Sequence, residues 1–248
     1  MVKVLIMMAD YGHDPTETAV PYTTFKKAGL DVNFATEAGK SPECDVKMLR
    51  GVTQTLLGAN SKVVQQYDAM TASDEWKHPM AWTAPDLTLD SFDLVFLPGG
   101  HDKAVSQIID SGAVHKLLVD FYPKTRKPSH KAIGAVCHGV MVLSNAKTDN
   151  GKSVLHGCVT TALPARFEQL AYWGTRAFLG DYYKTYGAGS EDVEVSVRKQ
   201  LADPSHFKCS LLPTPFVVED DSFNYISARF PGDVGPMAER LVKLVQRS

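Results

Sequence analysis

The chain has 248 residues, of which 44% are hydrophobic and 22% are charged, and its formal net charge is −2. This length suits one large domain or one domain with an insertion. The small net charge gives no electrostatic reason to expect binding to nucleic acid or to an anionic membrane, and no apolar run approaches the ~20 residues that span a bilayer. The four cysteines have neither CxxC nor metal-ligand spacing, so we expect free thiols, no metal site and no bound cofactor.

The first forty residues predict a β-α-β unit. Residues 2–8 are almost continuously apolar, which is typical of a strand that is covered on both faces. Polar residues follow this run too soon for a signal peptide, so we expect a cytoplasmic, reducing location. Residues 17–29 carry apolar side chains at helical spacing and end at a glycine, and residues 31–36 alternate as a strand does.

Residues 38–90 depart from this pattern, because they are polar, contain several prolines and glycines, and have only weak helical stretches near 60–72. We interpret them as an insertion between core strands of a single domain that spans residues 1–248. The insertion is expected to form a cap or a surface lobe. Its aromatic residues include Trp82, which either covers a binding site or packs on the surface.

The rest of the chain continues the alternation of strands and helices. Strands are expected at 92–97, 131–136, 158–161, 216–218 and 224–227, and helices at 102–122, 138–146, 165–178, 190–202 and 234–246. Such an alternation predicts an α/β fold with a mostly parallel sheet and helices on both of its faces.

Cys137 lies where one of these apolar strands meets the helix that follows it. Small residues, among them Gly134 and Gly139, permit a sharp turn that exposes the cysteine side chain at the C-terminal edge of the sheet. The helix N-terminus beneath the sulfur favours thiolate over thiol. A buried structural cysteine is the alternative, but no other cysteine of the chain has such surroundings. We therefore predict that Cys137 is a nucleophile.

Two neighbouring features complete a candidate for nucleophilic catalysis. His138 follows Cys137 directly and is a candidate general base. The preceding apolar strand ends in a Pro-Gly-Gly-His sequence at residues 98–101, where the glycines let the backbone approach a ligand closely. Alone, this sequence marks only a turn. Beside Cys137 it predicts an oxyanion hole formed by the N–H groups of Gly100 and His138, with His101 close to the substrate.

These motifs resemble those of the ThiJ/PfpI superfamily, whose fold is shared with glutamine amidotransferase domains. The resemblance is carried by Val4–Ala9, Glu17, Leu97–His101 and Ala135–Gly139. It implies a flavodoxin-like three-layer sandwich with a nucleophile elbow at the C-terminus of a strand. The predicted site residues are most similar to the Cys-His-Glu arrangement of glyoxalase III and heat-shock holdases. The chain itself resembles a longer, divergent subgroup of the superfamily. Homodimers are common in this family, so the resemblance implies that the protein forms a homodimer.

The resemblance implies that Glu17 is the acid beside the nucleophile. A carboxylate next to a thiolate would raise the pKa of both groups. The pair works only if the Glu17 carboxyl keeps its proton and donates a hydrogen bond to the sulfur. From the residues alone, Glu17 is better explained as a helix N-terminal acid that the helix dipole favours.

The resemblance also implies a carboxylate that orients His138 and that stands shortly after the next strand. Glu168 falls at this place and is the only acid between residues 150 and 181. A solvated acid on a helix face is the alternative. Shorter, parkinsonism-associated relatives place a histidine where this chain has Ala162 and Leu163, which favours the adjacent Cys-His pair here.

Three further residues are candidate substrate ligands. Tyr182 and Tyr183 belong to a tyrosine-rich segment without a match in the glyoxalase III branch, and their hydroxyls either place a substrate or pack against the body. Arg229 precedes the last helix, in a loop that approaches the nucleophile in relatives. It either binds a carboxylate or carbonyl oxygen of the substrate or forms a surface salt bridge.

These features favour a cysteine-dependent enzyme that acts on a small carbonyl compound. The resemblance implies glutathione-independent glyoxalase III-like conversion of an α-oxoaldehyde to a 2-hydroxy acid. One alternative is an amidase or other hydrolase of the same fold that acts on a specialised substrate. Another is an oxidative-stress sensor or holdase in which Cys137 is oxidised. A glutaminase subunit is not favoured, because the chain has no HxE pair after residue 138.

Overall fold

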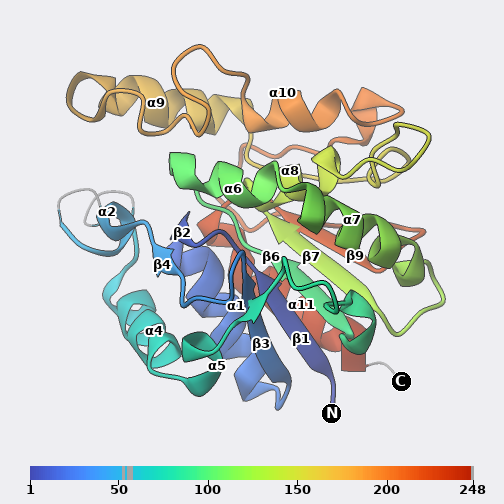
Figure 1. The fold of residues 1–248 in the computed structure, drawn as a ribbon. Helices are drawn as coiled ribbons and strands as arrows, with labels where there is room; N and C mark the ends of the chain where they lie inside the picture. The colour runs from blue at the N-terminus through green and yellow to red at the C-terminus, as the bar shows by residue number, and fades with distance from the viewer. Residues whose placement is uncertain (52–53, 55–57, 247–248) are drawn as a thin grey trace.

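A computed structural model describes residues 1–51, 54 and 58–246, and a seven-stranded sheet lies at the centre of this part of the chain (Figure 1). The strands lie in the order β5 (Met80–Ala81), β3 (Asp31–Thr36), β1 (Lys3–Met7), β6 (Leu94–Leu97), β7 (Ala132–Val136), β9 (Tyr225–Ala228) and β8 (Val217–Glu219). Neighbouring strands are parallel except for β8 and β9, which form an antiparallel pair near the C-terminus.

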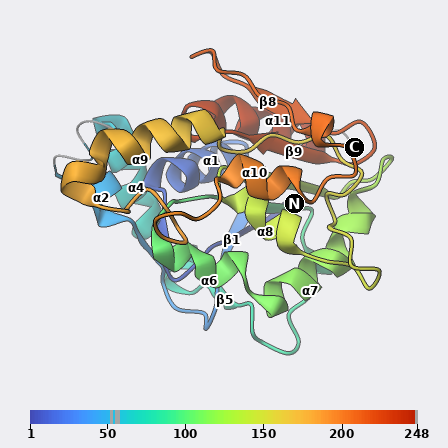
Figure 2. The same cartoon turned by 90° about the horizontal axis from the view of Figure 1, so that it is seen from above.

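Helices cover both faces of the sheet, so the predicted three-layer α/β fold is confirmed (Figure 2). One face carries α1 (Pro15–Lys27), α4 (Ser61–Thr71) and α11 (Val234–Gln246), and the other carries α6 (Ser106–Ile109), α7 (Gly112–Phe121) and α8 (Gly139–Asn145). Each face buries its own hydrophobic cluster. The burial of apolar area on both faces explains why the central strands have nearly continuous apolar sequences.

The central strands β6 and β7 position the turns predicted to carry the chemistry. Every residue of the two strands is buried, and Leu97 lies opposite Ala135 in the parallel register. Because both strands run in the same direction, their C-terminal ends meet at one edge of the sheet. The glycine turn after β6 and Cys137 after β7 therefore lie side by side.

Much of the segment 38–90 packs against the main body. Its strand β4 (Glu43–Cys44) pairs with β2 (Tyr11–His13) in a small second sheet, and β5 adds an edge to the main sheet. Helix α4 packs against α1, while α2 (Val46–Leu49) and α5 (Asp74–Lys77) flank it. Its residues 52–53 and 55–57 lie outside the described part of the chain.

Two helices lie across the C-terminal edge of the sheet, at the top of Figure 1. They are α9 (Ala165–Leu179) and α10 (Val193–Arg198), so the second of the two predicted helices is shorter than expected. The strand predicted at 158–161 is wrong: Thr160 makes an isolated bridge to Phe207, and its neighbours follow an irregular path. Short 3-10 turns lie at η1 (Leu89–Ser91), η2 (Lys103–Val105), η3 (Tyr122–Thr125), η4 (Pro204–His206) and η5 (Pro231–Asp233).

In the described ranges, no helix is long and apolar enough to cross a membrane.

Candidate active site

Cys137 occupies the sharp turn that the sequence predicts between β7 and α8. Of the non-glycine residues that the structure describes, it is the one in the left-handed region, with φ of 57°. A backbone of this kind costs on the order of 1–3 kcal/mol and persists only where its surroundings enforce it. The N–H of Cys137 donates to the carbonyl of Ala228 at 3.1 Å. A Cβ on Gly139 would lie 2.2 Å from the carbonyl oxygen of Leu97, so only glycine fits at this position next to the Cys137 turn.

The Cys137 side chain, 7% exposed, lies at a pocket of about 260 Å³. The apolar walls of the pocket are Met48, Leu163, Phe167, Ala171, Phe230 and Pro231. Its polar side chains come from Asp14, Glu17, His101, His138, Glu168 and Tyr183. The pocket therefore brings together all four predicted catalytic residues and two of the predicted substrate ligands.

His138 is placed to accept the proton of the Cys137 thiol. Its Nδ1 lies 3.4 Å from the sulfur. Burial, with a smaller contribution from the positive charge of Lys184, lowers the pKa of His138 to about 3. The imidazole is therefore neutral near pH 7, with a ring nitrogen free to receive a proton, but a pKa this low makes it a weak base.

Burial, together with the nearby carboxyl groups of Glu17 and Asp14, raises the pKa of Cys137 well above its usual range. The resting pair is thus a thiol and an imidazole rather than the thiolate expected from the helix N-terminus. Removal from water disfavours the anion more than the short helix α8 and the N–H of His138 favour it.

Glu17 lies in the first turn of α1, beside the sulfur. Its Oε2 accepts a hydrogen bond from the N–H of Gly99 at 2.9 Å, and its side chain is hydrogen-bonded to Cys137. Burial, and secondarily the charge of Asp14, raises the pKa of Glu17 well above its usual range. A carboxyl that keeps its proton can donate to the sulfur, which is the arrangement that the sequence argument required.

The glycine turn after β6 approaches both of these groups. A Cβ on Gly99 would lie 2.6 Å from Oε2 of Glu17 and 2.8 Å from Cβ of Cys137. Gly100 has φ of 143°, and a Cβ there would lie 2.4 Å from the carbonyl oxygen of Gly12. Gly100 and His138 both line the pocket, as their predicted role in an oxyanion hole requires.

Glu168 lies at the pocket, but its carboxylate is held by other partners. Its Oε1 accepts from Nζ of Lys184 at 3.0 Å, and its Oε2 accepts from the N–H of Val193 at 2.8 Å. Among the described residues, no hydrogen bond joins Glu168 to His138. The role of Glu168 as the group that orients His138 therefore stays a prediction.

Residues 182–185 form a buried strap that connects the α9 layer to the pocket. Lys184, 2% exposed, bonds to Glu168 and also to Asp192, the residue before α10. Thr185 donates from its hydroxyl to the carbonyl of His101 at 2.9 Å. The strap thus ties α9 and α10 to the glycine turn.

The two tyrosines of the strap lie on either side of His101. The ring of Tyr183 stacks on the His101 ring with centroids 4.4 Å apart, and the ring of Tyr182 meets it edge-on at 4.6 Å. The hydroxyl of Tyr182 donates to Asp45, whose Oδ2 also lies 3.6 Å from Nε2 of His101. Only Tyr183 of this pair lines the Cys137 pocket.

Two of the predicted substrate ligands lie elsewhere. Trp82 belongs to the hydrophobic cluster on the α7 face and lines a separate hollow next to Phe121. Arg229 is fully buried and forms an ion pair with Asp233 at 2.7 Å. Its guanidinium also donates to backbone carbonyls within residues 210–214. Arg229 therefore holds an irregular loop in place and does not face the pocket.

Sequence reasoning missed Asp14 and Lys184. Asp14 caps α1 by accepting from the N–H groups of Thr16 and Glu17, and burial raises its pKa to about 6. An aspartate three residues before Glu17 is a recognisable capping signal, so its position could have been predicted. Lys184 carries no comparable signal, because its partners are brought to it by a loop.

A family model described as ThiJ/PfpI family-like matches residues 8–209. The chain belongs to this family. A relative from Schizosaccharomyces pombe, described only as an uncharacterized protein, is 27% identical over 98% of this chain and 84% of its own length. The glutathione-independent glyoxalase hsp3101 of the same yeast is 26% identical, over 59% of this chain and 56% of its own.

Solved structures of ThiJ/PfpI-type proteins share the fold. Glyoxalase III from Candida albicans superposes with a TM-score of 0.71 at 18% identity, and the alignment covers 100% of this chain and 98% of that one. Drosophila melanogaster DJ-1beta superposes with a TM-score of 0.58 at 14% identity, covering 100% and 91%. At these identities the similarity establishes the architecture alone.

The described residues contain no group of three or more His, Cys, Asp or Glu side chains that is placed to hold a metal ion.

Proposed function

We propose that this protein is a cysteine-dependent enzyme that converts an α-oxoaldehyde to a 2-hydroxy acid without glutathione. The observation that carries the proposal is the Cys137 thiol, held in a strained turn 3.4 Å from a neutral His138 at the base of a small apolar pocket. The 26% identity to a yeast glutathione-independent glyoxalase supports the same chemistry. A volume of about 260 Å³ suits a small molecule rather than a peptide conjugate.

The first step is addition of the Cys137 sulfur to the aldehyde carbon. The thiol proton moves to His138, and the carbonyl oxygen takes the negative charge within reach of the N–H groups of Gly100 and His138. Protonation of this oxygen gives a hemithioacetal. His138 is neutral at rest and has a ring nitrogen free for the thiol proton, but its low pKa makes this transfer unfavourable on its own, so the transfer accompanies formation of the C–S bond.

The second step moves hydrogen within the substrate. A base removes the proton from the former aldehyde carbon, and a proton is returned to the neighbouring carbon, so the aldehyde is oxidised and the ketone is reduced. The product is a thioester on Cys137. Water hydrolyses it, releasing the 2-hydroxy acid and restoring the thiol. Glu17, with its proton kept by burial, stabilises the departing thiolate by donating to the sulfur.

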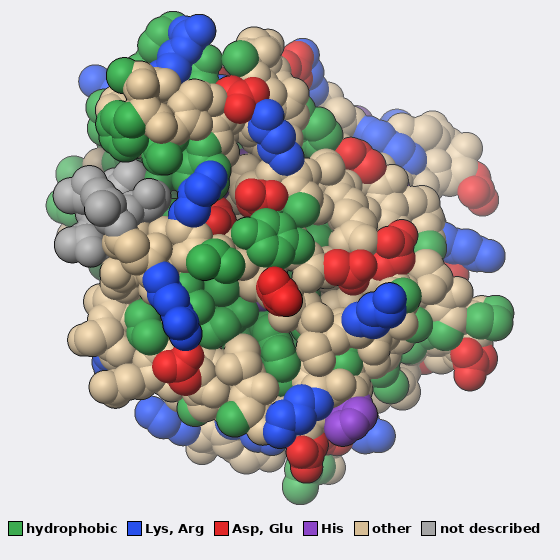
Figure 3. Space-filling model, turned by 60° about the vertical axis from the view of Figure 1, so that its left-hand side comes forward, with side chains coloured by type: hydrophobic (Ala, Val, Ile, Leu, Met, Phe, Trp, Pro, Cys, Tyr) green, Lys and Arg blue, Asp and Glu red, His purple; other side chains and the backbone are tan. Residues whose placement is uncertain are grey.

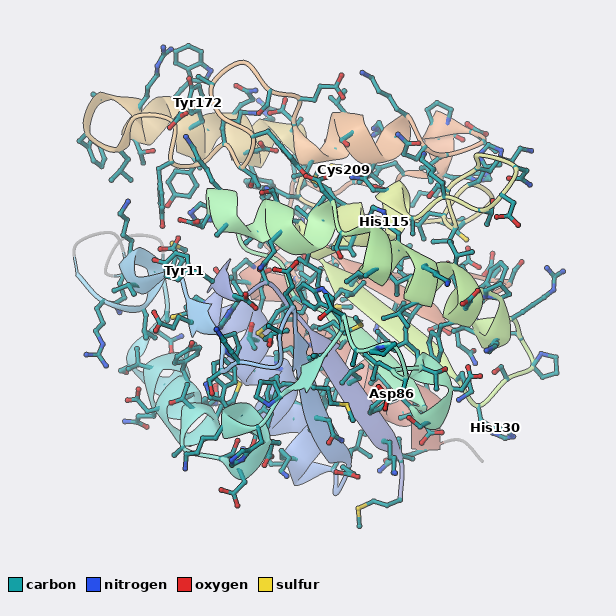
Figure 4. The ribbon with its side chains drawn as sticks, in the orientation of Figure 1. Tyr11, Asp86, His115, His130, Tyr172 and Cys209 are labelled. Carbon is teal, nitrogen blue, oxygen red and sulfur yellow. The ribbon has the colours of Figure 1, made fainter. Side chains whose placement is uncertain are left out.

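The test is incubation of the purified protein with methylglyoxal, with lactate measured by NMR. We expect lactate from the wild type and a loss of about 10⁴-fold in the Cys137→Ser variant, because the nucleophile is removed. The Cys209→Ser variant is the control, since Cys209 is exposed, is not among the residues that line the pocket and lies near α10 (Figure 4). Equal consumption by wild type and Cys137→Ser would refute the proposal.

A hydrolase that acts on an amide would use the same nucleophile and oxyanion donors. It differs in its product, because amide hydrolysis releases ammonia and leaves methylglyoxal untouched. Ammonia release from a panel of small neutral amides, with no lactate from methylglyoxal, would favour this second function.

A further inference from the structure

Tyr183 carries a buried hydroxyl that has no hydrogen-bond partner among the described residues. Its side chain is 7% exposed, and its ring is held against His101 in a stacked contact. A buried hydroxyl without a partner is unfavourable, so such groups are rare in native proteins. The neighbouring Tyr182, in contrast, donates its hydroxyl to Asp45. Of the two tyrosines, the unpaired one is thus the one that lines the pocket, and Nε2 of His101, which also lines it, likewise has no hydrogen-bond partner among the described residues.

The surroundings of this hydroxyl make it a hydrogen-bond donor. Burial, assisted by the negative charges of Asp45 and Asp14, raises the pKa of Tyr183 to about 12. The phenol stays protonated near pH 7, so its hydroxyl can donate a hydrogen bond. A ligand that offers an acceptor would therefore pair this hydroxyl.

The rest of the pocket restricts the charge of the ligand. No lysine or arginine is among the described residues that line it, whereas Asp14, Glu17 and Glu168 are. The ammonium of Lys184 is already paired with Glu168 and Asp192. A substrate carboxylate or phosphate would be buried without a cationic partner, at a cost of several kcal/mol. The apolar walls, which include Phe167 and Phe230, suit an uncharged hydrocarbon group.

We propose that Tyr183 and the apolar walls bind the non-reacting half of the substrate, an uncharged α-oxoaldehyde with an apolar substituent whose ketone oxygen accepts a hydrogen bond from Tyr183. This inference rests on the proposed function, in which Cys137 attacks the aldehyde carbon next to that ketone. It predicts that an aryl compound such as phenylglyoxal is a better substrate than an oxoaldehyde with an acidic side chain.

Alkylation of Cys137 tests this subsite without requiring turnover. The sulfur displaces bromide from 2-bromoacetophenone, benzyl bromide or bromopyruvate, forming a C–S bond as the thiol proton goes to His138. The first reagent is neutral and has the ketone, the second lacks the ketone, and the third has the ketone and a carboxylate. Rates are measured by peptide mass spectrometry at Cys137 and divided by the rates for N-acetylcysteine.

Two adjacent variants form a matched pair. Tyr183→Phe removes only the unpaired hydroxyl, so we expect an unchanged or slightly higher melting temperature. We also expect reaction with 2-bromoacetophenone to be about fivefold to tenfold slower, with benzyl bromide unaffected, as the loss of one hydrogen bond predicts. Tyr182→Phe removes the bond to Asp45, so it should lower stability without changing the ratio of the two rates.

The wild-type protein alone gives a further comparison. We expect its normalised rate with bromopyruvate to be at least tenfold below that with 2-bromoacetophenone. Equal normalised rates for these two reagents, or equal slowing of 2-bromoacetophenone and benzyl bromide by Tyr183→Phe, would overturn the inference. Phenylglyoxal turnover is measured in parallel. Turnover of phenylglyoxal without ketone-dependent alkylation would refute the Tyr183 subsite but not the enzymatic activity. Ketone-dependent alkylation without turnover of phenylglyoxal would refute the proposed function alone.

Discussion

Cys137 combines a strained backbone with a side chain that is almost removed from water. The strain fixes the direction of the sulfur, and burial controls its charge. Burial holds the pKa of Cys137 above its ordinary value and lowers that of His138 to about 3, so both are neutral near pH 7. This state differs from a preformed thiolate-imidazolium pair, in which the sulfur would react rapidly even in mildly acidic solution.

The pH dependence of alkylation by iodoacetamide tests this charge state. Because the pKa of Cys137 is raised, the thiolate fraction grows about tenfold per pH unit below that pKa. We expect the rate at Cys137 to rise steadily from pH 6 to pH 9, measured by quantitative peptide mass spectrometry. N-acetylcysteine is the reference. A rate that is already constant between pH 6 and pH 7 would contradict the account.

Gly99 offers a second test at the scale of one residue. In Gly99→Ala, the new methyl group would lie 2.8 Å from Cβ of Cys137 and 2.6 Å from Oε2 of Glu17, so these groups must shift. We expect methylglyoxal turnover to fall by about 100-fold, which is the scale of loss from a displacement of about 1 Å. Gly112→Ala is the control, because its Cβ would meet open space. Similar activity in both variants would contradict the proposed geometry.

At the scale of elements, the strap over residues 182–185 connects α9, α10 and the glycine turn. Lys184 is its most buried side chain and forms two ion pairs, with Glu168 and Asp192. Removing one partner of a buried pair leaves the other charges without compensation. The strap therefore contributes both to stability and to the position of Glu168 at the pocket.

The variant Lys184→Met tests the strap. We expect it to lower the free energy of unfolding by about 3–5 kcal/mol, measured by urea denaturation, because Glu168 loses its ammonium partner. Lys103→Met is the control, since the pair of Lys103 with Asp181 joins the same loop but is exposed, and it should leave the denaturation midpoint almost unchanged. Equal effects of the two substitutions would argue against a structural role for the strap.

Local patterns predicted the elements that carry the nucleophile, because apolar strands and glycine turns depend on neighbouring residues. The partners of Glu168 could not be predicted in this way. Lys184 is separated from it by an irregular loop, and no periodic pattern places the two together. The strand expected at 158–161 failed because the N–H groups of Val159 and Thr161 donate to the side chains of Asp220 and Ser227 rather than to a neighbouring strand. Arg229 was misinterpreted because its acceptors are the carbonyls of another irregular loop.

At the scale of the whole molecule, the site lies between the sheet edge and the α9 layer. Figure 3 shows hydrophobic side chains gathered at the top of this face, over α9, where Leu170, Trp173 and Phe178 are exposed. Below this layer, the pocket and the adjoining small sheet bury His13, His101 and His138. Burial lowers the pKa of each of these histidines to about 3.

These histidines make stability depend on pH. In the unfolded chain they bind protons below about pH 6.5, whereas in the folded protein they stay neutral down to about pH 3. Their contribution to stability is therefore present above pH 6.5 and is lost as the pH falls. Asp14 and Glu17 act in the opposite direction, because burial raises their pKa values and the folded protein holds their protons.

Between about pH 4.5 and pH 6, the unfolded chain thus binds about one proton more than the folded protein at these five groups. We expect the histidine part of this difference to lower the free energy of unfolding on acidification across this range, measured by urea denaturation. His13→Gln, which removes a histidine that lies beside Tyr67, should make this slope less steep. A slope that His13→Gln leaves unchanged would contradict the account.

The conversion of phenylglyoxal to mandelate tests the central claim most directly, because it needs the Cys137 nucleophile and the apolar pocket at once. We predict that the wild-type protein forms mandelate without added glutathione, detected by NMR. We also predict that Cys137→Ser, folded as judged by its melting temperature, forms none above the uncatalysed rate. Mandelate formation at the wild-type rate by Cys137→Ser would contradict the account.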